Sequence, residues 1–165
     1  MSFTIIPATT DHAAVINSMT HELAEFEKLP KGPELSENEL REAIAEKNLF
    51  GFVALIEEQV VGFVMCYYGF STWQGKFIFM EDLYVRLAHR KGGIGKALWK
   101  EVAKVAFEQN LRRIQWTVLD WNTNAINFYK SIGATDMHDR DGWLDFRLFR
   151  PAIAKFVGGN SDNGV

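Results

Sequence analysis

The sequence predicts an α+β (α/β) domain in which a mixed, mostly antiparallel sheet is flanked by helices. Two observations carry this prediction: three consecutive β-prone runs lie between residues 51 and 85, and segments of helical periodicity precede and follow them. A chain of 165 residues with 47% hydrophobic residues can bury one core of its own. We therefore expect a single domain over residues 3–150, followed by a C-terminal tail at 151–165 whose end is disordered.

The expected elements follow one another in the order β-α-α-β-β-β-α-β-α-β-β. Apolar residues at three- and four-residue spacing predict a first helix from about Thr10 to Phe26. Ser36 and Glu39 form a capping-box sequence that begins a second helix. The further expected elements are strands at 2–6, 51–56, 60–70 and 76–85, a helix at 94–109, a strand at 113–119, a short helix capped by Asn122 and ending at Gly133, and strands at 134–138 and 143–149.

Composition excludes several classes of function. The 18 basic and 21 acidic residues form no run of like charge, which argues against a nucleic-acid or membrane-surface partner. No apolar run reaches the length of about 18 residues that a membrane span needs, and the single Cys66 fits a reducing compartment. We therefore expect a soluble, cytoplasmic protein. The four scattered histidines form no metal-ligand spacing, and no Gly-x-Ser-x-Gly nucleophile motif occurs, so we expect neither metal catalysis nor a serine hydrolase.

The most informative segment is a basic, glycine-rich loop between a strand and a helix, Arg90-Lys91-Gly92-Gly93-Ile94-Gly95-Lys96. Unpaired N–H groups at a helix start bind phosphate, and the N–H groups of residues 91–96 are the expected ligands. The loop is not a nucleotide P-loop, because Arg90 stands where that motif has its first glycine and Ala97 where it has a hydroxyl. Nor is it a dinucleotide fingerprint, since Leu98 replaces the third glycine. A plain glycine-rich turn before a helix is the alternative.

Two adjacent carboxylates, Glu81 and Asp82, interrupt an otherwise apolar strand. Neighbouring strand residues face opposite sides, so at least one carboxylate points into a covered region or a cleft. Such a carboxylate is either functional, or it pairs with an arginine or caps a turn. Tyr129 lies near the end of the expected short helix, where spacing alone indicates packing in the core or at its rim.

The loop from Arg90 to Gly95 resembles the pyrophosphate-binding motif Arg/Gln-x-x-Gly-x-Gly/Ala of the GNAT acetyltransferases. Over about residues 3–150 the chain is also similar to the diamine acetyltransferases, the spermidine/spermine and thialysine branch. The blocks that carry this similarity are Glu22-Leu23-Ala24-Glu25-Phe26-Glu27-Lys28-Leu29, Ser71-Thr72-Trp73-Gln74-Gly75-Lys76, Glu81-Asp82-Leu83-Tyr84-Val85, Val118-Leu119-Asp120-Trp121-Asn122 and Asn127-Phe128-Tyr129-Lys130. The resemblance implies the GNAT fold, whose sheet is splayed between its fourth and fifth strands to admit acetyl-CoA.

The resemblance further implies acetyl-CoA-dependent transfer of an acetyl group to a primary amine by direct attack in a ternary complex. Glu81 would be the base, acting through water, because a free alkylamine arrives protonated. Tyr129 would donate a proton to the coenzyme A sulfur. The strand residues Leu83, Tyr84 and Val85 would pair with the pantetheine, and one of their N–H groups would stabilise the oxyanion.

The resemblance also implies binding roles. Asn122 and Lys130 match positions that contact the cofactor, although a helix cap and a solvated lysine are the alternatives. The positions that match the lining of the amine channel, where carboxylates and aromatic faces favour cations, are Glu27, Trp73, Asp82 and Trp143.

The expected substrate is a small diamine, polyamine or thialysine- or lysine-like amine. Phe26 stands where polyamine enzymes tend to have tyrosine, which favours the thialysine branch. Another amine, such as an aminoalkylphosphonate, a protein N-terminus or an aminoglycoside, is an alternative, as is a non-catalytic acetyl-CoA sensor, against which Glu81 and Tyr129 together argue. Relatives form homodimers through their C-terminal strands, so we expect a homodimer that uses Trp143 to Phe149.

Overall fold

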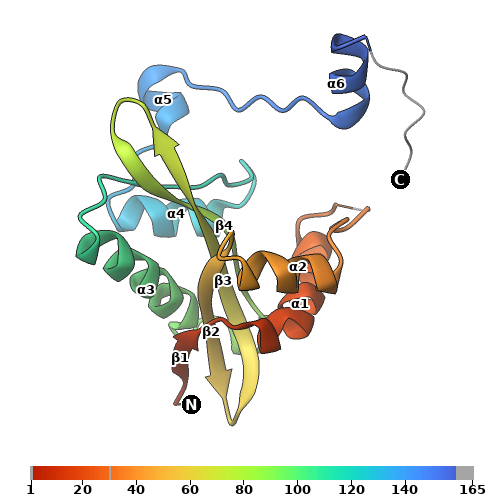
Figure 1. Cartoon of the computed structure of the whole chain (residues 1–165). Coiled ribbons are helices and arrows are strands. Elements are labelled where there is room, and N and C mark those ends of the chain that lie inside the picture. The colour runs from red at the N-terminus through yellow and green to blue at the C-terminus, as the bar shows by residue number, and fades with distance from the viewer. Residues whose placement is uncertain (1, 30, 159–165) are drawn as a thin grey trace. The chain divides into compact units, whose positions relative to one another are not determined.

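The computed structural model describes residues 2–29 and 31–158, which fall into two compact units, Met1–Leu119 and Asp120–Val165 (Figure 1). The disorder predicted for the end of the chain concerns residues 158–164, and all of these except Gly158 lie outside the described residues. Within the described part, no helix combines the length and the apolar character needed to cross a bilayer.

The first unit contains a five-stranded sheet with the strand order β1-β2-β3-β4-β5. Its strands are β1 (Thr4–Pro7), β2 (Phe50–Ile56), β3 (Gln59–Ser71), β4 (Gly75–Val85) and β5 (Ile114–Gln115). The first four strands pair antiparallel, and β5 alone runs parallel to β4. The mixed, mostly antiparallel sheet is therefore confirmed, and β2, β3 and β4 lie where alternation and the short turns predicted them.

Helices cover both faces of this sheet. Helices α1 (Ala13–Phe26) and α2 (Glu37–Ala45) lie on one side of it, and α3 (Ile94–Glu108) lies on the other (Figure 1). Phe63 and Met65 of β3 pack in the core with the apolar face of α1. Val64, between them, faces the opposite side and is fully buried, as is Leu98 of α3. Burial on both faces explains why β3 has an almost continuous apolar sequence.

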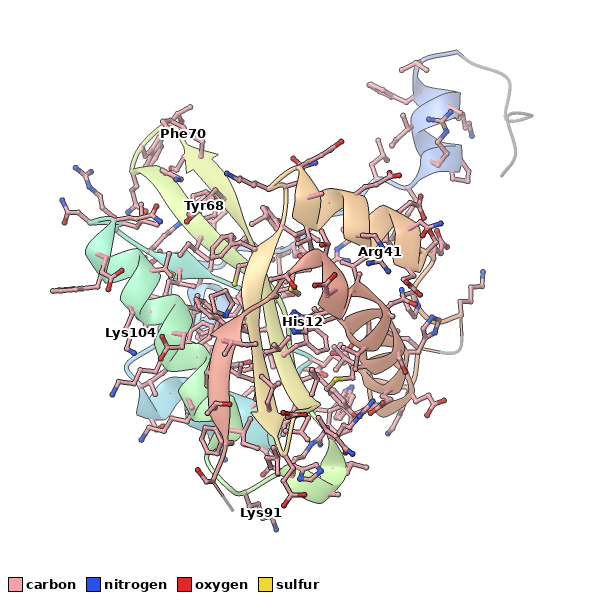
Figure 2. The ribbon with its side chains drawn as sticks, turned by 60° about the horizontal axis from the view of Figure 1, so that its bottom comes forward. His12, Arg41, Tyr68, Phe70, Lys91 and Lys104 are labelled. Atoms are coloured by element: carbon pink, nitrogen blue, oxygen red, sulfur yellow. The ribbon has the colours of Figure 1, made fainter. Side chains whose placement is uncertain are left out.

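The start of α2 forms as its capping-box sequence predicted. The Ser36 hydroxyl accepts a hydrogen bond from the Glu39 N–H at 3.3 Å, and the Glu39 carboxylate accepts one from the Ser36 N–H at 2.8 Å. Arg41, labelled in Figure 2, donates to the Thr10 carbonyl at 2.6 Å. Thr10 belongs to the 3-10 turn η1 (Thr10–His12) that leads into α1, so Arg41 links α2 to the beginning of α1.

The sheet opens between its fourth and fifth strands. Only Ile78 and Phe79 of β4 have partners in β5, and residues 80–85 have no β5 residue in register. β5 is shorter than the strand predicted at 113–119, and it ends where Trp116 packs edge-on against Trp99 of α3, with ring centroids 4.7 Å apart. The edge of β4 beyond Phe79 is therefore left without a neighbouring β5 strand.

The second unit contains three short helices, α4 (Thr123–Ser131), α5 (Met137–Asp141) and α6 (Arg150–Phe156). The Asn122 side chain caps α4 by accepting from the Ala125 N–H at 3.3 Å. Gly133 follows the end of α4 with a φ of 90°, a left-handed conformation that favours glycine. Both features confirm the predicted limits of this helix.

The strands predicted at 134–138 and 143–149 are wrong in this structure. The Asp136 carboxylate accepts from the N–H groups of His138 (2.9 Å) and Asp139 (3.3 Å), so the first segment ends in a helix cap and α5 follows it. Residues 143–149 keep a β-prone sequence, but in the described part of the chain no strand pairs with them. A strand needs a hydrogen-bonded neighbour, and sequence preference alone does not supply one.

Candidate functional site

Glu81 lies at an irregularity in the ladder between β3 and β4. Met80 pairs with Cys66 and Asp82 pairs with Met65, so Glu81 has no residue directly opposite. This arrangement is a β-bulge, which re-aims the side chain of the extra residue. The Glu81 side chain is exposed, and that of Asp82 is partly buried.

Glu27, Glu81 and Asp82 lie close enough for their charges to interact, and we call them the acidic trio. Burial first, and then the negative charges of Glu81 and Glu27, raise the pKa of Asp82 to about 6. Burial also raises the pKa of Glu27, which directly follows α1. Among the described residues no ion pair engages Glu81 or Asp82, which argues against the arginine-paired alternative. Such a set of carboxylates attracts a cation.

The glycine-rich loop leads into α3 with its backbone exposed. Gly93 is the N-cap of this helix, with a φ of 84°, and no side chain caps the first turn. The N–H groups at the start of the 15-residue helix therefore keep the capacity to bind an anion. Ile94 is buried and anchors the helix start, whereas Lys91, Gly92 and Lys96 are exposed, and Gly95 is partly buried. Lys91 and Phe70 lie at opposite ends of the sheet (Figure 2).

The Arg90 side chain contacts protein groups on two elements. Its Nε donates to the Val85 carbonyl at 2.8 Å. Its guanidinium carbon lies 4.6 Å from the centre of the Phe26 ring and 5.3 Å from that of Tyr84. Tyr84 and Val85 are buried and Leu83 is partly buried, all on the stretch of β4 that β5 does not cover. The backbone N–H groups of the loop are therefore available to an anion, whereas the Arg90 side chain packs against α1 and the end of β4.

An ion pair that sequence reasoning missed joins α1 to the residue after β4. Arg86 and Glu22 approach to 2.9 Å, and Arg86 also donates to the Val60 carbonyl at 3.2 Å. Glu22 and Arg90 both lie near the Tyr84 hydroxyl. Its pKa is raised by burial and by the charge of Glu22, and the charge of Arg90 acts in the opposite direction. Glu22 and Arg86 are 64 residues apart, so no local pattern pairs them.

The residues predicted to donate the proton and to contact the cofactor from beyond the loop belong to the second unit. Tyr129 of α4 is partly buried, with the Phe128 ring 5.6 Å away, and burial raises the pKa of its hydroxyl to about 12. Asn122 serves as the helix cap that was the alternative for it, and Lys130 is exposed. The contacts of these three residues with a cofactor stay predictions.

The two tryptophans predicted to line an amine channel are exposed. Trp73 is 89% exposed in the turn between β3 and β4, and Trp143 is 67% exposed in the second unit. Six residues of extended strand separate the start of β4 at Gly75 from Glu81, a distance of about 20 Å. Trp73 therefore lies away from the acidic trio, and the channel role of both tryptophans stays a prediction.

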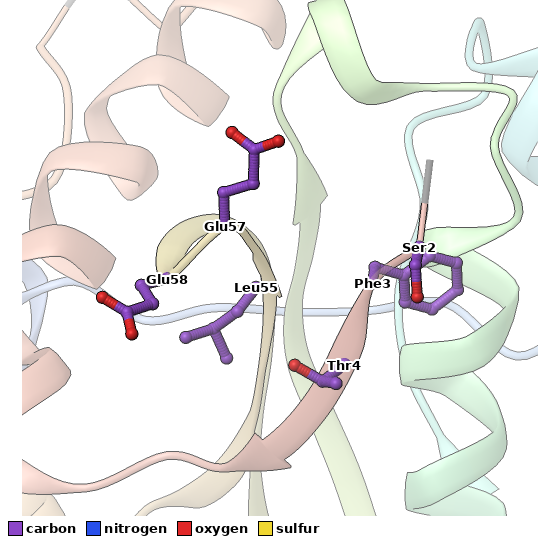
Figure 3. A pocket seen from close by; sticks show the side chains of 6 residues that line it. All are labelled: Ser2, Phe3, Thr4, Leu55, Glu57 and Glu58. Atoms are coloured by element: carbon purple, nitrogen blue, oxygen red, sulfur yellow. The ribbon is translucent and has the colours of Figure 1, made fainter.

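Two surface hollows occur elsewhere in the first unit. One, of about 180 Å³, lies between the N-terminal segment and the β2–β3 turn and includes Thr4, Leu55 and Glu58 (Figure 3). The other, of about 490 Å³, includes His21 and Glu25 on α1. Neither contains a predicted site residue. Among the described residues no group of three or more His, Cys, Asp or Glu side chains is arranged to hold a metal ion.

Comparison with known proteins places these features in a family. Residues 16–134 match the Acetyltransferase (GNAT) family. The chain is 41% identical over 156 residues to a thialysine N-epsilon-acetyltransferase of Caenorhabditis elegans, covering 94% of this chain and 98% of that protein. It is 38% identical over 154 residues to the Mus musculus protein of the same name, covering 87% and 90%. An integron cassette protein from the mobile metagenome of V. cholerae has the same fold, with a TM-score of 0.75, 25% identity and coverage of 95% and 98%.

The chain belongs to the GNAT acetyltransferase family, and its five-stranded mixed sheet flanked by helices is the fold of that family. It is an N-acetyltransferase. The predicted resemblance to the thialysine branch is confirmed by these relatives.

Proposed function

We propose that the protein transfers an acetyl group from acetyl-CoA to the primary amine of a thialysine- or lysine-like substrate. The observation that carries this proposal is the acidic trio beside the bulge in β4. Its carboxylates have no ion-pair partner among the residues that the structure describes, so they can attract a substrate that carries ammonium groups. The C. elegans and Mus musculus relatives named for thialysine support this choice. Small diamines and polyamines share the same chemistry and belong in the same test.

The residues present fit acetyl-CoA, the cosubstrate of GNAT acetyltransferases. The exposed, uncapped start of α3 at Gly93 fits a pyrophosphate, with the N–H groups of residues 91–96 as donors. The β4 edge at residues 83–85 is free of β5 and fits an amide-bearing chain that pairs like an added strand. We propose that Asn122 and Lys130 contact the same molecule. Acetyl-CoA supplies the acetyl group as an activated thioester.

The chain's own groups would move the protons. Glu81 accepts a proton from the substrate ammonium through water, and the freed nitrogen attacks the thioester carbon. A backbone N–H of residues 83–85 stabilises the negative charge on the carbonyl oxygen. As the new C–N bond forms and the C–S bond breaks, the Tyr129 hydroxyl donates its proton to the departing sulfur. The second proton lost by the nitrogen returns to Tyr129 through solvent. A pKa of about 12 keeps the Tyr129 hydroxyl protonated at neutral pH.

We propose that Glu27 and Asp82 bind the distal ammonium of the substrate, with Trp143 lining its path. We further propose that residues 3–150 act as one acetyltransferase domain and that the protein works as a homodimer. The exposed apolar residues of the unpaired segment 143–149 support the dimer, since an extended segment of this kind gains most from pairing with a second chain.

A thiol-release assay with acetyl-CoA tests the function. The purified protein is offered thialysine, lysine, putrescine, spermidine, spermine, an aminoalkylphosphonate and a peptide N-terminus. We expect thialysine or lysine to give the highest kcat/KM. Glu81→Gln and Tyr129→Phe should each lower kcat by about a hundredfold or more, whereas Glu58→Gln, an exposed turn residue, should leave it unchanged. Binding of acetyl-CoA without release by any amine would refute the proposed acceptor class.

A further inference from the structure

The last turn of α1 meets the first residue of the glycine-rich loop. The Arg90 guanidinium lies 4.6 Å from the Phe26 ring centre, within the range of a cation–π contact. The same guanidinium lies 5.3 Å from the Tyr84 ring centre, and its Nε holds the Val85 carbonyl at 2.8 Å. Arg90 is thus held by α1 on one side and by the end of β4 on the other.

Glu22 extends this contact along the same face of α1. Glu22 and Phe26 are four residues apart, so their side chains lie one above the other on the helix. Glu22 forms the 2.9 Å ion pair with Arg86, and its charge lies near enough to the Tyr84 hydroxyl to raise the pKa of that group. One helix face therefore contacts three consecutive features: the end of β4, the residue after it, and the first residue of the loop.

Phe26 also directly precedes Glu27 of the acidic trio. The Phe26 ring contacts Arg90, and the charge of the adjacent Glu27 raises the pKa of Asp82. The end of α1 therefore contributes one residue next to the proposed amine site and one residue that contacts the proposed pyrophosphate loop.

We propose that Phe26 is a positioning residue for the pyrophosphate loop, acting through Arg90 and not through the amine substrate. This inference rests on the function proposed above. Stacking restricts a long side chain that has many rotamers, and the restricted guanidinium holds the carbonyl end of β4 next to the loop. Without the ring, Arg90 gains freedom, and the N–H groups of residues 91–96 lose part of their preorganisation for the pyrophosphate.

For this role, the aromatic ring of Phe26 matters and the missing tyrosine hydroxyl does not. A tyrosine hydroxyl is absent here, but the aromatic face is present and contacts Arg90. The substitution that matters is therefore loss of the ring, and addition of a hydroxyl should be tolerated.

Calorimetric titration with coenzyme A, in the absence of amine, tests the proposal. We expect Phe26→Leu to raise the Kd for coenzyme A about fivefold or more, the size of one lost cation–π contact. Phe26→Tyr keeps the ring and should stay within about twofold of the unaltered protein, as should the matched control Phe107→Leu on α3, whose side chain is 87% exposed. In steady state, Phe26→Leu should raise the KM for acetyl-CoA and leave the KM for the amine within about twofold.

A double-mutant cycle with Arg90→Lys tests whether Phe26 affects coenzyme A binding through Arg90. Lysine keeps the charge but lacks the planar group that stacks, so it should weaken coenzyme A binding in the same way. If Phe26 acts through Arg90, the double variant should bind no more weakly than the weaker single variant. The proposal would be overturned if Phe26→Leu left coenzyme A binding unchanged or raised only the KM for the amine. It would also be overturned if the losses of coenzyme A binding free energy in the two single variants added up in the double variant. Failure of the unaltered protein to bind coenzyme A would instead remove the proposed function and this inference with it.

Discussion

Among single residues of the candidate site, Asp82 differs from an ordinary surface carboxylate in its pKa. Its pKa is raised to about 6 by burial and by the charges of Glu81 and Glu27. The proton is bound more tightly in the folded protein than in the unfolded chain, so the free energy of unfolding falls as the pH rises from about 4 to about 6. At neutral pH the ionised Asp82 lowers the free energy of unfolding by its full amount. In the proposed function, the ammonium group of the substrate pairs with this carboxylate.

Asp82→Asn should therefore stabilise the substrate-free protein at pH 7, by up to about 3 kcal/mol for a pKa shift of roughly two units. The gain should disappear below about pH 4, where Asp82 is protonated in both states. Urea unfolding at several pH values measures this, with the exposed Asp120→Asn as the matched control. A gain that persists unchanged at low pH would mean that the charge of Asp82 is not its source.

The sequence was enough to single out Glu81 and Asp82, because two carboxylates conflict with an otherwise apolar strand. It could not predict the bulge at Glu81, since that depends on how β3 and β4 align. The link between Glu22 and Arg86 escaped prediction for the same reason: it is a tertiary contact between distant segments.

At the scale of elements, local signals decided which predictions held. The start of α2 was predictable because Ser36 and Glu39 satisfy each other's free N–H groups within one turn. The strand at 134–138 was mispredicted because the Asp136 cap outweighs the β preference of that segment. The strand at 113–119 was predicted too long, because the opening of the sheet after Gln115 is a tertiary property.

Ser36→Ala should lower the free energy of unfolding by about 1 kcal/mol, because the mutation removes the acceptor that caps α2. Chemical denaturation measures the change. Ser18→Ala, at an exposed position within α1, should be neutral or slightly stabilising because alanine favours a helix interior. Equal effects of the two substitutions would contradict the role of the cap.

Gly93→Ala should cost about 1 kcal/mol of stability, because its φ of 84° is unfavourable for any residue with a side chain, although nothing crowds the added methyl group. Gly92 has no positive φ, and a Cβ there would meet the His89 carbonyl at an ordinary 3.7 Å. Gly92→Ala should therefore change stability by less than about 0.5 kcal/mol. Thermal unfolding of the pair measures the difference, and equal losses would show that crowding, not backbone conformation, limits this loop.

At the scale of the whole molecule, the segment 143–149 is the main departure from the predicted strands. Its apolar side chains are largely exposed, with Phe146 at 87%. Pairing with a second chain would supply the neighbour that the β-prone sequence lacks. The extended but unpaired segment is thus what the proposed homodimer would complete.

Phe146→Asp should shift the protein towards the monomer, because it introduces a charge into the proposed interface. Light scattering after gel filtration measures the mass. Phe70→Asp is the matched control, since Phe70 is 79% exposed at the far end of β3 in the first unit. A mass that stays dimeric in Phe146→Asp and falls in Phe70→Asp would place the interface at the β3–β4 hairpin.

A competition assay tests whether the protein transfers acetyl groups to a thialysine-like amine. Thialysine and spermidine at equal concentration are incubated with the protein and acetyl-CoA, and the acetylated products are identified by mass spectrometry. We expect acetylated thialysine to accumulate first and coenzyme A to be released in equal amount. Acetylation of spermidine alone would contradict the assigned substrate, and release of coenzyme A with neither amine acetylated would contradict amine transfer itself.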